Sequence, residues 1–169
     1  DVSVYDGDVR FMSKLDAGVV ASSVTSFAMQ STFERIELHF GAQARAKGIE
    51  LRVRPTRMRV KSDAALLDRI VRNLVANAIR YTSKGGVLVG CRRRGEHLRI
   101  EVWDTGIGIP AEKRQEIFQE FVQLGNAERD RSKGLGIGLS IVRRVAKLLN
   151  HPIGLDSRLG KGSRFYVDV

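Results

Sequence analysis

Two asparagines, Asn73 and Asn77, stand four residues apart in the most strongly patterned stretch of the chain. Apolar residues recur around them at steps of three and four, which predicts a helix over residues 66–81 with one buried face. That spacing puts both amides on one side of the helix, with Arg80 and Tyr81 one turn further on. Such amides either satisfy neighbouring polar groups or offer a carbonyl oxygen to Mg²⁺, which prefers oxygen ligands and takes few from the protein.

A second motif, Asp104-Thr-Gly-Ile-Gly-Ile-Pro110, leaves a predicted strand and leads into a helix. A carboxylate only accepts hydrogen bonds, so Asp104 at a strand end suits an exocyclic amino group such as that of adenine. Gly106 and Gly108 allow the backbone to approach a flat ring closely. Turns that contain Asp and Gly are common, so the motif taken alone also fits an ordinary turn.

Two glycine-bearing motifs follow. In Lys133-Gly-Leu-Gly-Ile-Gly-Leu-Ser140 a glycine fills every second position directly before a helix. Free backbone N–H groups at such a helix start form a phosphate site, and an ordinary flexible loop is the alternative. In Gly160-Lys-Gly-Ser-Arg-Phe165, Ser163 is placed to reach a base through its hydroxyl or through water, although the motif alone signals only a hairpin turn.

The elements that must position these motifs can be predicted from patterning. The sequence predicts an α+β fold, a two-layer sandwich in which a mixed, mostly antiparallel sheet of about five strands is covered on one face by about three helices. A capping box at Ser31-Thr-Phe-Glu34 opens a helix that ends near Lys47, and Ser62 or Asp63 caps the asparagine helix. The other expected elements are an extended segment 26–29, a small hairpin of 49–54 and 58–61 around a turn at residue 55, strands 87–91 and 98–103, a helix from residue 110, a helix over 137–149, and strands 153–156 and 164–167.

In their order and spacing the four motifs resemble the ATP-binding catalytic domain of bacterial sensor histidine kinases, within the gyrase, chaperone and MutL ATPase superfamily. The resemblance covers residues 27–169 and implies the Bergerat-type ATP-binding fold. Ile117-Phe-Gln-Glu-Phe121 looks like the family's phenylalanine box, or is simple core packing, and residues 150–157 are similar to a run in hybrid sensor kinases. Residues 1–20 look like the tail of a dimerisation helix and its linker, which leaves 21–169 as the catalytic domain. Phe11, Met12 and Leu15 are expected to face a partner helix outside this chain.

The resemblance implies ATP and Mg²⁺ as cofactors and Asn73, Asn77 and Arg80 as catalytic residues. Asn77 is then the metal ligand, Asn73 its companion near the phosphates, and Arg80, where the family usually has lysine, a planar phosphate contact. Tyr81 lies beside the nucleotide and Asp104 reads adenine. The other implied nucleotide-binding residues line the base pocket or the lid: Gly106, Gly108, Ile109, Lys133, Gly134, Leu135, Gly136, Gly138, Leu139 and Ser163. The lid cations Arg129, Arg131 and Lys133 are candidates for the outer phosphates, or are solvated loop charges.

The residue four positions before the implied metal ligand decides the expected reaction. Hydrolysing members of the superfamily carry a glutamate four residues before the metal asparagine, and Asn73 stands there in this chain as an amide that cannot accept a proton. The chain is therefore expected to hold ATP and pass its γ-phosphate to a histidine on a dimerisation domain outside this chain, because His39, His97 and His151 lack the family's phospho-acceptor motif. The alternatives are a serine kinase of the anti-sigma type, and a nucleotide-sensing or receiver-docking module without catalysis.

Composition narrows the class of protein and its partners. The chain has 169 residues, enough for one domain, and a formal net charge of +10. Its basic residues alternate along predicted strands without interleaved aromatic residues, which argues against nucleic-acid binding. No apolar run approaches the length of a membrane span, so a cytoplasmic domain is expected, whether or not the full-length protein is membrane-anchored. The single cysteine, Cys91, forms no internal disulfide and suits a reducing compartment. The expected partners are the histidine-bearing dimerisation domain and a response-regulator receiver domain, in a homodimeric full-length protein.

Overall fold

A five-stranded mixed sheet organises the computed structural model, which describes residues 2–114, 116–118 and 137–169, with side chains from residue 6 onward. Its spatial order is β2 (Glu50–Val53), β4 (Gly86–Arg94), β5 (His97–Asp104), β7 (Gly162–Asp168) and β6 (Ile153–Arg158). Only β2 and β4 run parallel, and the other neighbours are antiparallel. A separate two-stranded antiparallel sheet pairs β1 (Thr25–Ala28) with β3 (Arg59–Ser62).

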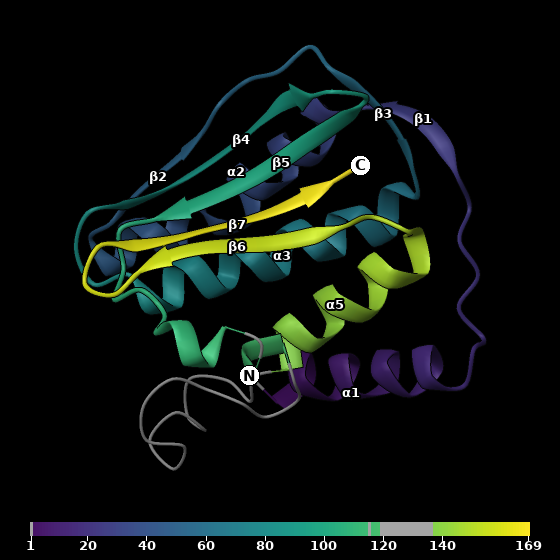
Figure 1. Cartoon of the computed structure of the whole chain (residues 1–169), viewed down its shortest axis with the longest axis horizontal. Coiled ribbons are helices and arrows are strands. Elements are labelled where there is room, and N and C mark those ends of the chain that lie inside the picture. The colour runs from purple at the N-terminus through teal and green to yellow at the C-terminus, as the bar shows by residue number, and fades with distance from the viewer. Residues whose placement is uncertain (1, 115, 119–136) are drawn as a thin grey trace.

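Helices α2 (Met29–Lys47), α3 (Ala64–Tyr81) and α5 (Ile137–Leu149) cover one face of the large sheet (Figure 1). The central α3 places Leu67, Ile70 and Val75 in full burial, and the sheet contributes Val89 and Ile100 to the same core. Within the described residues this arrangement confirms the predicted two-layer α+β sandwich with a mixed sheet of five strands covered by helices. Within the described residues no helix is both long and apolar enough to cross a membrane.

Helix α1 (Val2–Asp16) corrects one expectation, because its apolar face does not await a partner helix outside the chain. Met12 is buried in the core cluster, with Phe11 and Leu15 packed against it. Helix α1 runs alongside α5 (Figure 1), and its acidic residues pair with this chain's own arginines. Asp8 contacts Arg69 of α3 at 3.4 Å, and burial raises the pKa of Asp8 above its ordinary value. Apolar residues of this chain therefore bury Met12 and part of the surface of Phe11 and Leu15.

The predicted hairpin of residues 49–54 and 58–61 is wrong, because the two strands belong to different sheets. The backbone N–H of Arg54 donates to the Val89 carbonyl at 2.9 Å, which extends the parallel ladder of β2 with β4. Thr56 then bridges α2 and β4, since its N–H donates to the Gln30 side chain and its hydroxyl contacts Cys91. Alternating residues define which face of a strand is buried, but they do not define its partner.

Two helix starts also differ from the prediction. Helix α2 begins at Met29, directly after β1, and its N-cap Ala28 makes no side-chain hydrogen bond, so Ser31 is not a cap. The Met29 N–H instead donates to the Met58 carbonyl at 3.0 Å, which satisfies the helix start from the small sheet. Pro110 precedes only a 3₁₀ turn, η1 (Ala111–Lys113), followed by η2 (Glu116–Phe118), rather than opening an α-helix.

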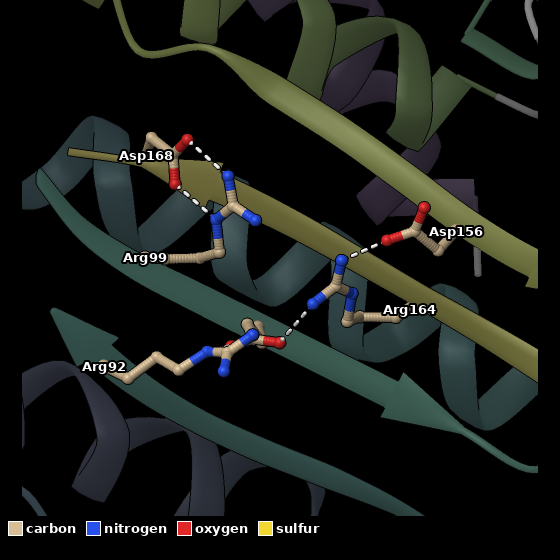
Figure 2. Close-up of polar contacts among 6 residues, drawn as sticks. Arg92, Arg99, Asp156, Arg164 and Asp168 are labelled. Carbon is tan, nitrogen blue, oxygen red and sulfur yellow. Dashed lines mark hydrogen bonds and ion pairs between the residues drawn. The ribbon is translucent and has the colours of Figure 1, made fainter. Parts of the chain in front are cut away.

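The face of the large sheet opposite the helices carries a network of ion pairs (Figure 2). The guanidinium of Arg99 donates two parallel hydrogen bonds to Asp168, at 2.8 and 2.9 Å, across β5 and β7. Arg164 on β7 contacts Asp156 on β6 and Glu101 on β5. These contacts fix the register of the strands whose ends carry Asp104 and Ser163.

Candidate functional site

Helix α3 is held at both ends by side chains from other segments. At its start the Asp63 carboxylate accepts the Leu66 N–H at 2.9 Å, which identifies the cap among the two candidates predicted. At its end the Lys47 ammonium donates to the carbonyls of Ile79 and Arg80, at 2.5 and 2.7 Å. A cation at the carboxyl end of a helix complements its macrodipole. The last turn of α3, where the predicted site residues gather, is therefore fixed in position.

Asn73 brings α3 against the start of α5. Its side-chain Nδ2 donates to the Arg69 carbonyl at 2.9 Å, so the amide nitrogen is satisfied within its own helix. Its Oδ1 lies 3.0 Å from the point where a Cβ on Gly138 would stand. Any larger residue than glycine at 138 would press on this amide. The structure thus joins the asparagine helix to Gly138, the last glycine of the third motif, which lies in the first turn of α5.

Asn77, Arg80 and Tyr81 lie half-buried on the same stretch of α3. Among the described residues, no hydrogen bond is made by the side-chain amide of Asn77. Asn73 and Asn77 therefore differ: the nitrogen of the first donates to backbone, whereas the amide of the second has no hydrogen-bond partner among the described residues. Tyr81 is the last residue of α3, and its backbone carbonyl oxygen lies against Gly106 of the second motif.

Asp104 is linked to the end of α3 through Gly106. The Asp104 Oδ1 accepts the Gly106 N–H at 2.9 Å, and a Cβ on Gly106 would lie only 2.4 Å from the Tyr81 carbonyl oxygen. Burial raises the pKa of the Asp104 carboxyl above its ordinary value, while hydrogen bonds from the backbone of Gly106 and Ser163 oppose the rise. The predicted adenine reader therefore lies directly against the asparagine helix.

The loop after Asp104 is clamped by the β6–β7 turn. Gly108 has a φ of +74°, and a Cβ there would lie 2.2 Å from the Arg158 carbonyl oxygen, so only glycine fits. The Gly160 N–H donates to the Ile107 carbonyl at 2.7 Å. The buried Ile109 donates its N–H to the Ser157 hydroxyl, also at 2.7 Å. Ser163 on β7 faces Asp104 across the strand pair.

Sequence reasoning missed two residues of this region. Ser157 bonds to Ile109, Gly162 and Ser163, and Arg114 donates to its carbonyl. Thr105 ties the loop to the turn before β4, since its hydroxyl accepts the Gly86 N–H at 3.0 Å. No local sequence pattern marks Ser157, because its contact with Ser163 depends on the register of β6 and β7.

Only some of the remaining predicted residues lie within the part of the chain that the structure describes. Lys133, Gly134, Leu135 and Gly136, with Arg129, Arg131 and Phe121, lie outside the described residues. Leu139 is buried at the start of α5, and Phe118 packs edge-on against Phe165 with ring centroids 6.1 Å apart. The histidines take the expected structural or surface places: His39 and His97 are exposed, and His151 bonds to the Ser62 hydroxyl at 2.7 Å.

The residues present fit a magnesium-bound nucleotide. Among the described residues, no group of three or more His, Cys, Asp or Glu side chains is placed to hold a metal ion. The Asn77 amide oxygen is a hard ligand of the kind that Mg²⁺ accepts when phosphate supplies the others. Gly106, Gly108 and Gly138 let the segments around these residues pack closely, since a Cβ at each would press on the Tyr81 carbonyl, the Arg158 carbonyl or the Asn73 amide.

Comparison with known proteins agrees with this geometry. Residues 62–169 match the family described as histidine kinase-, DNA gyrase B- and HSP90-like ATPases. A sensor-like histidine kinase of Rhizobium meliloti is 36% identical over 161 residues, which cover 94% of this chain and 31% of the relative. The autoinducer 2 sensor kinase/phosphatase LuxQ of Vibrio vulnificus is 32% identical over 171 residues, which cover 96% of this chain and 20% of LuxQ. The chain thus spans less than a third of the length of these relatives.

Solved structures show the same fold. Full-length ShkA in complex with AMPPNP superposes with a TM-score of 0.82 at 28% sequence identity, over 96% of this chain and 34% of ShkA. The catalytic domain of the histidine kinase ThkA gives a TM-score of 0.74 at 24% identity, over 87% of this chain and 95% of that domain.

Proposed function

The chain belongs to the family of histidine kinase-, DNA gyrase B- and HSP90-like ATPases, as an ATP-binding catalytic domain of the sensor histidine kinase type, and we propose that it holds ATP with Mg²⁺ and donates the γ-phosphate to a histidine of a dimerisation domain. The observation that carries the proposal is the junction of Gly106 with the Tyr81 carbonyl. It supports a single nucleotide site that runs from Asp104 at the base to Asn77 at the phosphates.

Each half of the nucleotide meets a different element in this proposal. The Asp104 carboxylate accepts a hydrogen bond from the adenine amino group, and the backbone at Gly106 and Gly108 lies against the ring. Arg80 offers a planar, permanently charged guanidinium to the phosphates, and the backbone N–H groups before α5 offer further donors. Mg²⁺, held by Asn77 together with the phosphates, would neutralise charge on the transferring group.

The lack of a general base favours transfer over hydrolysis. Asn73 occupies the position at which a base would activate water, and its nitrogen already donates to the Arg69 carbonyl. An amide accepts no proton at neutral pH, so water near the γ-phosphate gains no activation from this residue. Phosphoryl transfer needs positioning and charge stabilisation above all, which suits a domain that waits for an external nucleophile.

The wider arrangement follows from the same proposal. Residues 1–20 are the end of a dimerisation helix with its linker, and 21–169 form the catalytic domain. A receiver domain of a response regulator takes the phosphate from the histidine, and the full-length protein acts as a homodimer. From the sequence motif we propose Lys133, Gly134 and Gly136 as lid residues, whereas Gly138 lies in the first turn of α5.

The experiment joins this domain to dimerisation helices that carry a phospho-acceptor histidine and supplies radiolabelled ATP with Mg²⁺. We expect acid-labile phosphate on the protein. The variants Asn77→Asp and Asp104→Ala should remove both nucleotide binding and label while the domain remains folded. Acid-stable phosphoserine on a partner would identify an anti-sigma type kinase, and nucleotide binding without any label would identify a sensing or docking module. ATP affinity that is unchanged in both variants would remove the assignment.

A further inference from the structure

Ser157 of β6 belongs to none of the four motifs, but it lies at the centre of a hydrogen-bond cluster that joins the second motif to the fourth. Its hydroxyl oxygen lies 2.7 Å from the Ile109 nitrogen, 2.8 Å from the Ser163 hydroxyl oxygen and 3.0 Å from the Gly162 carbonyl oxygen. Both serines are buried, and they face each other in the antiparallel register of β6 and β7. The cluster joins the loop after Asp104 to the strand that carries Ser163.

Counting protons gives the direction of each bond. The Ile109 N–H can only donate, and the Gly162 carbonyl can only accept. A hydroxyl has one proton and two lone pairs, so Ser157 satisfies all three contacts in one way only. It donates to Gly162, and it accepts from Ile109 and from Ser163. In the reverse arrangement the Ser157 hydroxyl would donate to Ser163. The Ser157 hydroxyl oxygen and the Gly162 carbonyl oxygen would then lie 3.0 Å apart with no proton between them.

The proton of Ser163 therefore points away from Asp104 and toward Ser157. Ser163 is paired with Asp104 across β5 and β7, and its backbone opposes the rise in the pKa of the Asp104 carboxyl. The two side chains then present only acceptors to the same site: the carboxylate of Asp104 and the lone pairs of Ser163. Acceptors attract an amino group and oppose a carbonyl oxygen at the same place.

We propose that Ser157 is a specificity-determining positioning residue, which holds the Ser163 hydroxyl as an acceptor and so favours 6-aminopurine over 6-oxopurine nucleotides. This inference rests on the proposed function, because it requires a purine at Asp104. Ser157 acts through Ser163 and does not touch the base. Ser157 also anchors the loop through its bond with Ile109. Loss of this anchoring should lower the affinities for both kinds of purine nucleotide by the same factor.

The test measures the binding of ATP and ITP, each with Mg²⁺, by titration calorimetry on the full chain. ITP carries a carbonyl where ATP carries the amino group, and a proton on N1 where ATP has a lone pair, so purine riboside triphosphate, which lacks the amino group but keeps the N1 lone pair, is titrated beside it. In Ser157→Ala the Ser163 hydroxyl is free to turn and donate, so the ratio of ATP to ITP affinity should fall about tenfold, the size of one hydrogen-bond preference. Ser157→Thr keeps a hydroxyl and should restore the ratio. Ser26→Ala, in the small sheet, is the matched control and should leave the ratio unchanged.

A second variant separates this role from the anchoring of the loop. Ser163→Ala removes the acceptor itself, so its ratio should also fall, and adding Ser157→Ala to it should change the ratio no further. Equal losses for ATP and ITP in Ser157→Ala, or a wild-type ratio in Ser163→Ala, would overturn the inference while leaving ATP binding intact. Failure of the wild-type chain to bind ATP at all would overturn the proposed function and this inference together.

Discussion

Replacing Asp104 by asparagine changes one atom of the proposed adenine reader and leaves its size almost unchanged. The Oδ1 atom accepts the Gly106 N–H at 2.9 Å, and an asparagine can keep that bond with its own Oδ1. The second oxygen then becomes an NH₂ group, which donates and cannot accept. An adenine amino group facing it would meet a donor where it requires an acceptor.

The size of the effect follows from the kind of bond that is lost. A hydrogen bond to a charged group contributes about 1.5–3 kcal/mol, so Asp104→Asn should weaken ATP binding about 10- to 150-fold. The fold should not suffer to the same degree. The pKa of Asp104 is raised, chiefly by burial, so its ionised form is disfavoured in the folded domain, and its stabilising contribution is lost as pH rises through the folded pKa. At neutral pH the neutral amide of Asp104→Asn avoids the free-energy cost of burying an ionised carboxylate. The free energy of unfolding of the variant should therefore equal or exceed that of the wild type.

Two measurements check this prediction. Titration calorimetry with ATP and Mg²⁺ gives the affinity, and urea denaturation gives the free energy of unfolding at the same pH. Wild-type affinity should also fall as pH is lowered through the raised pKa of Asp104, and the variant should lack this component while keeping any contribution from ATP itself. Affinity within twofold of the wild type, or a loss of stability that accounts for the lost binding, would refute the reasoning.

Three further predictions concern the structure around the site. Asp168→Asn should reduce the free energy of unfolding by about 1–2 kcal/mol at neutral pH. Hydrogen bonds from Arg99 lower the pKa of Asp168. The stabilisation is therefore present above the unfolded pKa of this carboxyl and is lost as pH falls through its folded pKa. Urea denaturation that gives the same difference in unfolding free energy between wild type and variant at neutral and at acidic pH would contradict this prediction. Leu67→Ala, at a fully buried position, should cost about 2–5 kcal/mol in the same assay, and a cost below 1 would mean that α3 is not central to the core. Gly108→Ala should cost about 1–2 kcal/mol from its left-handed backbone alone and should weaken ATP binding through its contact with Arg158, whereas a wild-type affinity would show that the clamp of the β6–β7 turn is dispensable.

Sequence periodicity was enough to predict the parts of the fold that burial controls. The stripe of apolar residues on α3 predicted its buried face, and the pattern of α5 predicted a helix with the observed bounds. The prediction failed where an element depends on its neighbour. The partners of β2 and β3, the start of α2 at Met29 and the docking of Met12 are all determined by contacts between segments far apart in the chain.

The candidate site shows the same division. Asp104, Asn73 and the glycines could be predicted as candidates because their residue types and spacing restrict the chemistry available to them. Ser157 was not found, because a serine on a strand is unremarkable until the register of β6 and β7 places it opposite Ser163. Its importance comes from three hydrogen-bond partners that no local pattern reveals.

The central claim is that one site binds adenine at Asp104 and magnesium-bound phosphates at Asn77. Its most direct test is a calorimetric titration of the full chain with AMPPNP, first with Mg²⁺ and then with a chelator in its place. We predict saturable binding of one nucleotide per chain that is clearly tighter when Mg²⁺ is present. No binding, or the same affinity with and without the metal ion, would contradict the account.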